Sequence, residues 1–304
     1  MIRLGLCCLF RAEPIRFRRT TAAHLRTMDR PAQLRKLAEL CRGNAAALQQ
    51  ALAYCRLHGI GCFRVQSQIL PLKTHPEVGY ELDELPDGPS IRELFRQCGR
   101  YARQHDIRTT FHPDQFILLS SPSPETTRQS LRELAYQAEV SEWIQADVIN
   151  IHAGGGYGDR PAALRRLRQR VEALPGPVRR RLTLENDDKL YTPADLLPLC
   201  RQTGVPLVYD VHHHRCLGDG LSVAEATLAA RETWDREPVV HLSSPREGWN
   251  GSNPRLHADF IDRADIPASW LSLGLTVEVE AKAKELAVLQ LQSWLAAGRP
   301  ATSG

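Results

Sequence analysis

Short apolar segments recur along this chain, and six of them end in a residue type that binds divalent metal ions. These six residues are His112, His152, Glu185, Asp210, His241 and Glu280. Three more histidines lie in the intervening segments and could join them: His75, His213 and His257. Imidazole and carboxylate together bind ions such as Zn²⁺ and Mn²⁺, and nine ligands are too many for a single tetrahedral ion. The set therefore predicts a centre of two or three divalent ions, whose metal the sequence does not fix.

A centre of this kind is suited to hydrolysis of a phosphodiester. One ion lowers the pKa of a bound water, and a second, roughly 3.5–4 Å away, stabilises the leaving oxygen. A carboxylate has to bridge the pair, and Glu185 is central enough in the series to do so. A lone histidine at a strand end is more often a hydrogen-bonded structural residue. The prediction therefore depends on many candidates falling at one topological level.

These residues need a fold that brings the ends of successive strands to one place. Apolar segments predict strands at residues 2–6, 62–65, 108–112, 147–152, 181–185, 206–211, 238–242 and 275–280. Helical periodicity and helix-start signals predict helices at 33–58, 90–105 (capped by Ser90), 124–144, 159–173, 192–203 (capped by Thr192), 222–235, near 254–263 and at 281–296. Strands that alternate with helices form a parallel sheet. Eight of them predict a closed α/β (β/α)₈ TIM barrel, whose active site lies at the C-terminal face of the strands.

We expect one barrel domain over residues 1–298 and a frayed tail at 299–304. Segments 7–32 and 66–89 are longer than plain connectors and fall on the C-terminal face, where long loops are usually functional. The consecutive histidines 212–214 cannot all be ligands in an extended segment, because neighbouring side chains then point apart. The glycine-rich run 154–158 lacks the lysine of a nucleotide-binding loop and suits close approach of a bulky ligand. Residues 186–188 could orient metal ligands, although 187 and 188 could equally be solvated loop acids.

Composition narrows the class of protein without naming a substrate. The net charge is +4, and only five of the 39 basic residues are lysine. Arginine binds phosphate through two parallel hydrogen bonds, but codon bias would explain the same excess equally well. The eight cysteines contain no Cys-x-x-Cys pair, which favours reduced, mostly buried thiols. No apolar run approaches the ~20 residues of a membrane span, and no signal-peptide core is present, so we expect a cytoplasmic location and no membrane partner.

Five strings of this sequence resemble the UV damage endonucleases, a family related to endonuclease IV. They are Arg108-Thr-Thr-Phe-His-Pro-Asp-Gln-Phe116, Ile149-Asn-Ile-His-Ala-Gly-Gly-Gly-Tyr-Gly158, Leu184-Glu-Asn-Asp-Asp-Lys189, Val240-His-Leu-Ser-Ser-Pro245 and Val279-Glu-Ala-Lys282. The resemblance covers nearly the whole chain in order and spacing. It implies a barrel enzyme that cuts DNA immediately 5′ to UV photoproducts, both cyclobutane dimers and 6-4 photoproducts. It also implies a 3′-hydroxyl and a 5′-phosphate as products, no need for ATP, and a cluster of divalent ions, typically Mn²⁺, with Zn²⁺ or Mg²⁺ as alternatives.

The same resemblance implies roles for individual residues. One ion would be held by His112, His152 and Glu185, a second by Glu185, Asp210, His241 and Glu280, and a third by His213 and His257. His75 matches a further histidine of the family's site, and the catalytic residues would be Glu185, Glu280 and Lys282. Contacts to DNA or to the lesion would come from Gln115, Phe116, Leu6, Tyr157 and Asn186.

Three of these positions need separate comment. Gln115 and Phe116 match the pair that probes the duplex and fills the gap left by flipped nucleotides, although Phe116 could also belong to the core with the apolar residues that follow it. Leu6 stands where family members often carry an aromatic residue, and Val239 where several relatives carry lysine. Lesion preference and any contribution of that lysine therefore do not transfer directly.

Other function classes remain open at this point. A sugar isomerase or epimerase of the same barrel superfamily also uses Glu, Asp and His at strand ends, but it needs only one or two ions. A protein that recognises damage without catalysis would not need the full ligand set. For the endonuclease we expect UV-damaged double-stranded DNA as the partner, no obligatory protein partner and a monomeric state.

Overall fold

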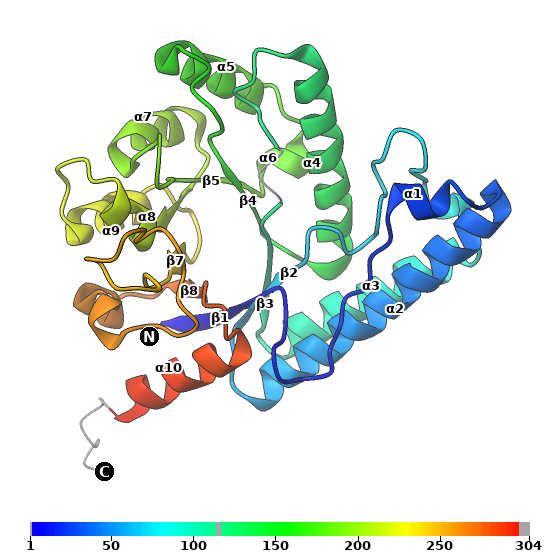
Figure 1. The fold of residues 1–304 in the computed structure, drawn as a ribbon, viewed down its shortest axis with the longest axis horizontal. Helices are drawn as coiled ribbons and strands as arrows, with labels where there is room; N and C mark the ends of the chain where they lie inside the picture. Colours follow the sequence, from blue (N-terminus) through cyan, green and yellow to red (C-terminus); the bar gives the residue numbers. More distant parts are fainter. Residues whose placement is uncertain (1, 114–116, 298–304) are drawn as a thin grey trace.

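The protein is described from a computed structural model, which describes residues 2–113 and 117–297. Eight parallel strands form a closed barrel in which each strand pairs with the next and the eighth with the first (Figure 1). The strands are β1 (Arg3–Cys7), β2 (Cys62–Val65), β3 (Arg108–Phe111), β4 (Val148–His152), β5 (Leu182–Glu185), β6 (Leu207–Asp210), β7 (Val239–Leu242) and β8 (Thr276–Val279). The predicted TIM-barrel fold is confirmed.

Helices surround this barrel (Figure 1). They are α1 (Ala22–Leu25), α2 (Arg30–Leu57), α3 (Gly88–Gln104), α4 (Pro124–Ile144), α5 (Arg160–Glu172), α6 (Gly176–Arg179), α7 (Pro193–Thr203), α8 (Val211–Cys216), α9 (Val223–Arg231) and α10 (Glu285–Ala297). In the described part of the chain there are also three short 3₁₀ turns: η1 (Leu82–Glu84), η2 (Arg263–Asp265) and η3 (Ala268–Ser272). Several starts are fixed by a side chain that accepts a backbone N–H three residues later, as Thr192 does at α7.

Some predicted helices differ from those observed. The helix predicted near 254–263 is wrong: the segment between β7 and β8 is irregular and contains only the turns η2 and η3. Residues 256–258 instead pair with the segment that follows β7: the backbone N–H of Arg246 donates to the carbonyl of Leu256 at 2.6 Å, and that of Ala258 to the carbonyl of Ser244 at 2.8 Å. The start of α3 is also different, since the helix begins at Gly88 after Asp87, which has a left-handed φ of 59°, and not at Ser90. The histidines 212–214 lie on the short helix α8, not on an extended segment.

Alternate residues of each strand face the helices or the inside of the barrel. Leu6 pairs in register with Phe63 and Val279, and all three belong to the apolar core. The residues beside them, such as Arg64 and Glu278, point to the opposite side and contact each other inside the barrel. The barrel interior is therefore polar at this level, whereas Val148, Val208 and Val239 form a separate apolar cluster.

The long segment between β1 and α2 is tied to the rest of the protein by buried polar side chains. The carboxylate of Glu285 accepts the backbone N–H groups of Arg11 at 2.8 Å and Ala12 at 2.6 Å. Asn44 hydrogen-bonds both the backbone N–H and the backbone carbonyl of Arg18, at 2.7 and 3.0 Å. All eight cysteines are free thiols, as expected. Within the described ranges, no helix combines the length and apolarity that crossing a membrane requires.

Candidate metal centre

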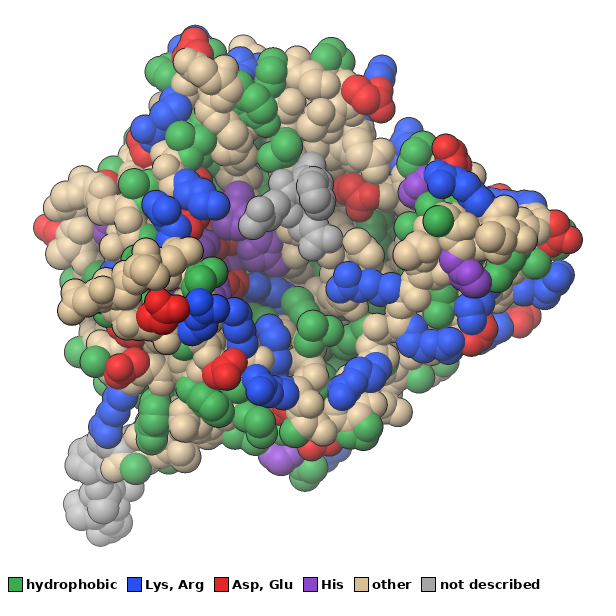
Figure 2. All heavy atoms as spheres, in the orientation of Figure 1, with side chains coloured by type: hydrophobic (Ala, Val, Ile, Leu, Met, Phe, Trp, Pro, Cys, Tyr) green, Lys and Arg blue, Asp and Glu red, His purple; other side chains and the backbone are tan. Residues whose placement is uncertain are grey.

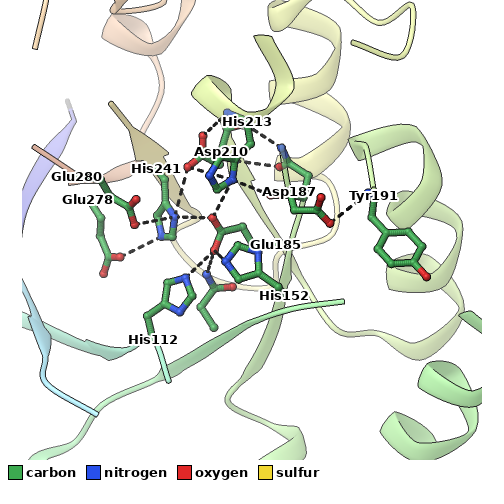
Figure 3. A network of polar contacts seen from close by, with 12 residues as sticks. His112, His152, Glu185, Asp187, Tyr191, Asp210, His213, His241, Glu278 and Glu280 are labelled. Carbon is green, nitrogen blue, oxygen red and sulfur yellow. Dashed lines mark hydrogen bonds and ion pairs between the residues drawn. The ribbon is translucent and has the colours of Figure 1, made fainter. Parts of the chain in front are cut away.

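The predicted ligands from six strands meet at the C-terminal mouth of the barrel. Figure 2 shows the histidines at the base of a hollow, with lysine and arginine side chains around it. This cavity has a volume of about 650 Å³, and its wall includes His112, His152, Glu185, His213, His257 and Glu280. Figure 3 shows most of these side chains pointing toward one another. The prediction that strand ends bring them together agrees with the structure.

Glu185, at the end of β5, lies at the middle of the cluster and is 1% exposed. Its Oε2 lies 2.8 Å from Nε2 of His112, and its Oε1 lies 3.1 Å from Nδ1 of His241 and 3.4 Å from Nδ1 of His213. The amide of Asn150 on β4 donates a hydrogen bond to Oε2. One carboxylate therefore faces ligands on both sides, as a bridging group must.

Among the described residues, three overlapping groups have ligand atoms close enough to hold an ion. They are His112 with His152 and Glu185, Glu185 with Asp210 and His213, and His112 with His241 and Glu280. The first group has the expected membership. The other two groups differ from the expected sets. His213 was expected with His257 and lies with Asp210 and Glu185, whereas His241 and Glu280 were expected with Asp210 and lie with His112. His257 is not in these groups, but its Nδ1 lies 3.8 Å from Oε2 of Glu280.

Helix α8 explains how His213 reaches the centre. Asp210 ends β6 and caps α8, since its Oδ1 accepts the backbone N–H of His213 at 2.8 Å. That turn brings Nδ1 of His213 to 3.5 Å from Oδ2 of Asp210. The Asp210 carboxylate thus shapes the backbone with one oxygen and faces the cluster with the other.

The electrostatics of the cluster favour positive charge between its carboxylates. Burial opposes ionisation of Glu185, but the neighbouring histidines, His241 first, hold its pKa well below the usual range. Burial likewise opposes protonation of His241, but Glu185 and Glu280 raise its pKa to about 10. Burial lowers the pKa of His152. Ionised carboxylates that share protonated histidines form a site in which cations could replace those protons.

Two buried atoms test whether this donor set fits metal ions. Within residues 2–113 and 117–297, Oδ2 of Asp210 and Nδ1 of His152 are buried without a hydrogen-bond partner. Buried polar atoms are normally satisfied, so each exception needs an explanation. Both residues belong to the groups above, and mixed imidazole and carboxylate donors suit Mn²⁺ or Zn²⁺. The residues present fit a divalent centre.

Two charged residues of the centre were missed from the sequence. Arg64 on β2 and Glu278 on β8 lie directly below the ligands and are 6% and 2% exposed. Arg64 contacts Glu278, Glu280 and His241. Strand alternation could have identified Glu278, because a residue two positions before Glu280 faces the same side of the sheet.

Other predicted site residues lie farther from the cluster. Nδ1 of His75 accepts backbone N–H groups of Glu77 and Val78, at 3.1 and 3.3 Å. Its ring lines a separate cavity of about 240 Å³ between the loop after β2 and α4. Lys282 follows β8 and is exposed. It is not among the described residues that line the main cavity. Tyr157 is 43% exposed on the loop between β4 and α5.

The structure does not support surface roles for Leu6 and Asn186. Leu6 is fully buried and faces the helices, so it is a core residue that cannot contact DNA in this conformation. Asn186 is also fully buried, and its side chain bonds the backbone N–H and carbonyl of Asp210, each at 2.9 Å. It joins the ends of β5 and β6 and so supports the ligands, in line with the interpretation of residues 186–188 as residues that orient metal ligands. Gln115 and Phe116 lie outside the described residues.

Comparisons with known sequences identify a family. A family model described as UV-endonuclease UvdE matches residues 2–300. The UV DNA damage endonuclease of Bacillus velezensis is 35% identical over 305 residues, which cover 96% of this chain and 92% of that protein. The protein of the same name from Bacillus cereus (strain Q1) is 35% identical over 266 residues, covering 84% of this chain and 81% of that protein.

Comparisons with solved structures support the fold. The crystal structure of SacUVDE has a TM-score of 0.85 at 24% identity, covering 98% of this chain and 99% of that one. Endonuclease IV from Thermus thermophilus has a TM-score of 0.57 at 16% identity, covering 97% and 98%. D-psicose 3-epimerase from Clostridium cellulolyticum has a TM-score of 0.55 at 14% identity, covering 83% and 87%. At these identities the likeness extends to the barrel alone.

Proposed function

Since this chain belongs to the UV-endonuclease UvdE family, we propose that it hydrolyses one strand of UV-damaged DNA immediately 5′ to the photoproduct. The proposed products are a 3′-hydroxyl and a 5′-phosphate, formed without ATP. Two or three divalent ions, Mn²⁺ first among the candidates, would be held by the three ligand groups around Glu185. We further propose that the enzyme acts as a monomer in the cytoplasm. The observation that carries the proposal is that these ligand groups meet in one cavity. The family membership of the chain then indicates which substrate the cavity acts on.

Bound ions would supply an activated water and neutralise charge on the phosphodiester. The residues of the chain would do the rest. Glu185 belongs to two of the ligand groups and would fix the separation between them. The amide of Asn150 would keep the Glu185 carboxylate oriented through its hydrogen bond to Oε2. Lys189 and Arg255, which line the cavity, would contact the DNA backbone, because cationic side chains there attract phosphate.

Damage selectivity would follow from the position of the ligands below the rim of the cavity. In an intact duplex, stacked bases keep each nucleotide and its phosphodiester in the helix. A photoproduct already disturbs that stacking. Extruding a damaged nucleotide costs less than extruding a normal one, by up to a few kcal/mol. Tyr157 lies on the same loop as Gly154 of the cavity wall, and its exposed aromatic ring could stack against a DNA base.

A plasmid-nicking assay tests the proposal. Purified protein with Mn²⁺ should nick UV-irradiated supercoiled plasmid far faster than unirradiated plasmid. Mapping the cut on an oligonucleotide with a single photoproduct should place it directly 5′ to the lesion. Equal rates on both plasmids would remove the damage-specific claim, and a cut elsewhere would remove the 5′ position.

Variants of one residue type test the role of the cluster. Glu185→Gln should reduce nicking below detection, because it removes the shared negative charge. Glu172→Gln, at the exposed end of α5, should nick like the original protein. Normal nicking by Glu185→Gln would refute the bridging role. A sugar epimerase would instead turn over ketoses at rates that hardly respond to salt, whereas DNA binding should weaken steeply as salt rises.

A further inference from the structure

Arg64 places a permanent positive charge inside the barrel, directly below the metal ligands. It lies on β2 and is 6% exposed. Its Nε donates to Oε2 of Glu278 at 2.6 Å, and its Nη1 donates to Oε1 of Glu280 at 2.6 Å. Its Nη2 lies 2.8 Å from Nε2 of His241. One guanidinium thus touches two members of a single ligand group and the carboxylate beneath them.

Glu278 is the second member of this lower layer. It is 2% exposed on β8, and its Oε2 lies 3.1 Å from Nε2 of His241. The hydroxyl of Thr110 donates to its other oxygen. Both carboxylate oxygens are therefore engaged within the barrel, and one of them faces the back of the His241 ring.

The front of the same ring faces the metal centre. Nδ1 of His241 lies 3.1 Å from Glu185 and 3.4 Å from Glu280. When Nδ1 is a ligand, the imidazole carries its proton on Nε2, and that proton needs an acceptor. A guanidinium has only donors. Of the two described residues that contact Nε2, only Glu278 can accept the proton. When Nε2 carries that proton, Nη2 of Arg64 can no longer donate to it and keeps Glu278 as its partner.

We propose that Glu278 and Arg64 are positioning residues of the metal centre. Glu278 orients His241 so that Nδ1 faces the ions. Arg64 holds Glu280 and balances the charge of two neighbouring carboxylates, that of the buried Glu278 on β8 and that of the half-buried Glu280 just after it. The inference rests on the proposed metal-dependent function and adds two residues to it that do not themselves bind metal.

Charge balance gives the physical reason for Arg64. Removing one partner of a buried ion pair leaves an uncompensated charge, which is strongly unfavourable. Without Arg64, the carboxylates of Glu278 and Glu280 would face each other with no cation between them and would move apart, which would displace Glu280 from its ligand group.

The chain contains a matched control in Arg108. This arginine begins β3, its side chain is 10% exposed, and it pairs with Asp147 through two contacts of 3.0 and 2.8 Å. It also donates to the backbone carbonyl of Glu237 at 2.7 Å. These partners lie at the opposite end of the barrel from the ligands. Replacing Arg108 removes the ion pair of another largely buried arginine, whose partner Asp147 is half-buried, and leaves the metal centre intact.

The experiment compares Mn²⁺ binding among folded variants, with calorimetry for affinity and electron paramagnetic resonance for the number of bound ions. Glu278→Met and Arg64→Met should bind at least one Mn²⁺ 10–100-fold more weakly, the usual effect of losing such a partner. Glu278→Gln keeps an acceptor and Arg64→Lys keeps the charge, so both should lose less. Arg108→Met should bind Mn²⁺ like the original protein.

Each result decides between separate claims. Unchanged Mn²⁺ binding in Glu278→Met and Arg64→Met would overturn the inference, and so would an equal loss in Arg108→Met. If a methionine variant fails to fold by circular dichroism, the glutamine and lysine variants decide in the same way. If the original protein binds neither Mn²⁺ nor Zn²⁺, the proposed metal-dependent function itself fails.

Discussion

Glu285 gives the most direct test of how the loop after β1 is held. Its carboxylate, fully buried at the start of α10, accepts three backbone N–H groups, from Arg11 at 2.8 Å, Ala12 at 2.6 Å and Glu13 at 3.3 Å. Glu285→Ala removes all of these bonds. The loop should then detach locally while the barrel stays closed.

The magnitude follows from the number of bonds and the exposure of the donors. A hydrogen bond to a charged group contributes about 1.5–3 kcal/mol when both partners are buried. Residues 11 and 12 are exposed, so water replaces part of the loss, and we take about 3–4 kcal/mol in total. With an unfolding entropy of about 2.1 cal/mol/K per residue, a chain of 304 residues should melt about 5–6 °C lower. Glu285→Gln, which keeps one accepting oxygen, should lose about half of that.

Thermal melting in EDTA measures the effect, and limited trypsin digestion locates it. Cleavage should become faster at the arginines of residues 11–19, and Mn²⁺ affinity should stay unchanged, because the candidate ligand groups follow β3 to β8. Glu225→Ala removes an exposed helix-start carboxylate and should lower melting less. A melting temperature within about 1 °C of the original, or a parallel loss of Mn²⁺ affinity, would refute the reasoning.

Three further outcomes are expected. Asn150→Ala should weaken Mn²⁺ binding roughly tenfold, because Glu185 loses the donor that orients it; unchanged calorimetric affinity would contradict this. His241 has a folded-state pKa of about 10, above its unfolded value of about 6.5, so its contribution to stability is full below the lower value and is lost as pH rises through the upper one. Metal-free protein should therefore melt lower at pH 10 than at pH 7, and His241→Asn should flatten that difference. Lys189→Ala should reduce the slope of log affinity for DNA against log salt by about one, whereas Lys36→Ala on the remote α2 should leave it unchanged.

The barrel could be predicted because its strands are short apolar segments at regular intervals. Parallel pairing then places every strand end on one face, which is why His112, His152 and Glu185 were expected at the same site. The prediction was wrong between β7 and β8, where residues 256–258 pair with the segment after β7 and form no helix. It also missed α8, because three consecutive histidines show no helical period. That helix is started by the capping carboxylate of Asp210.

The missed and misplaced site residues have a common cause, which is strand parity. Leu6 lies beside residues that face inward, but it faces outward itself, so its position near the strand end says nothing about DNA contact. The side chains of Arg64 and Glu278 point into the barrel, one level below the ligands. A charged residue within a buried strand is the signal that could have identified them. Its partner, however, comes from a strand more than 200 residues away, which sequence spacing does not reveal.

Closure of the barrel by β8 also bears on how the protein is made. One ligand group combines His112 from the third strand with Glu280 from the eighth, and β8 is the strand that pairs with β1. A nascent chain on the ribosome cannot complete that group until its last strand has emerged. A chain that stops before β8 exposes two open sheet edges, which favour aggregation. Partial chains that lack β8 thus have no nuclease activity, since the metal centre and the closed sheet are completed together when β8 joins β1.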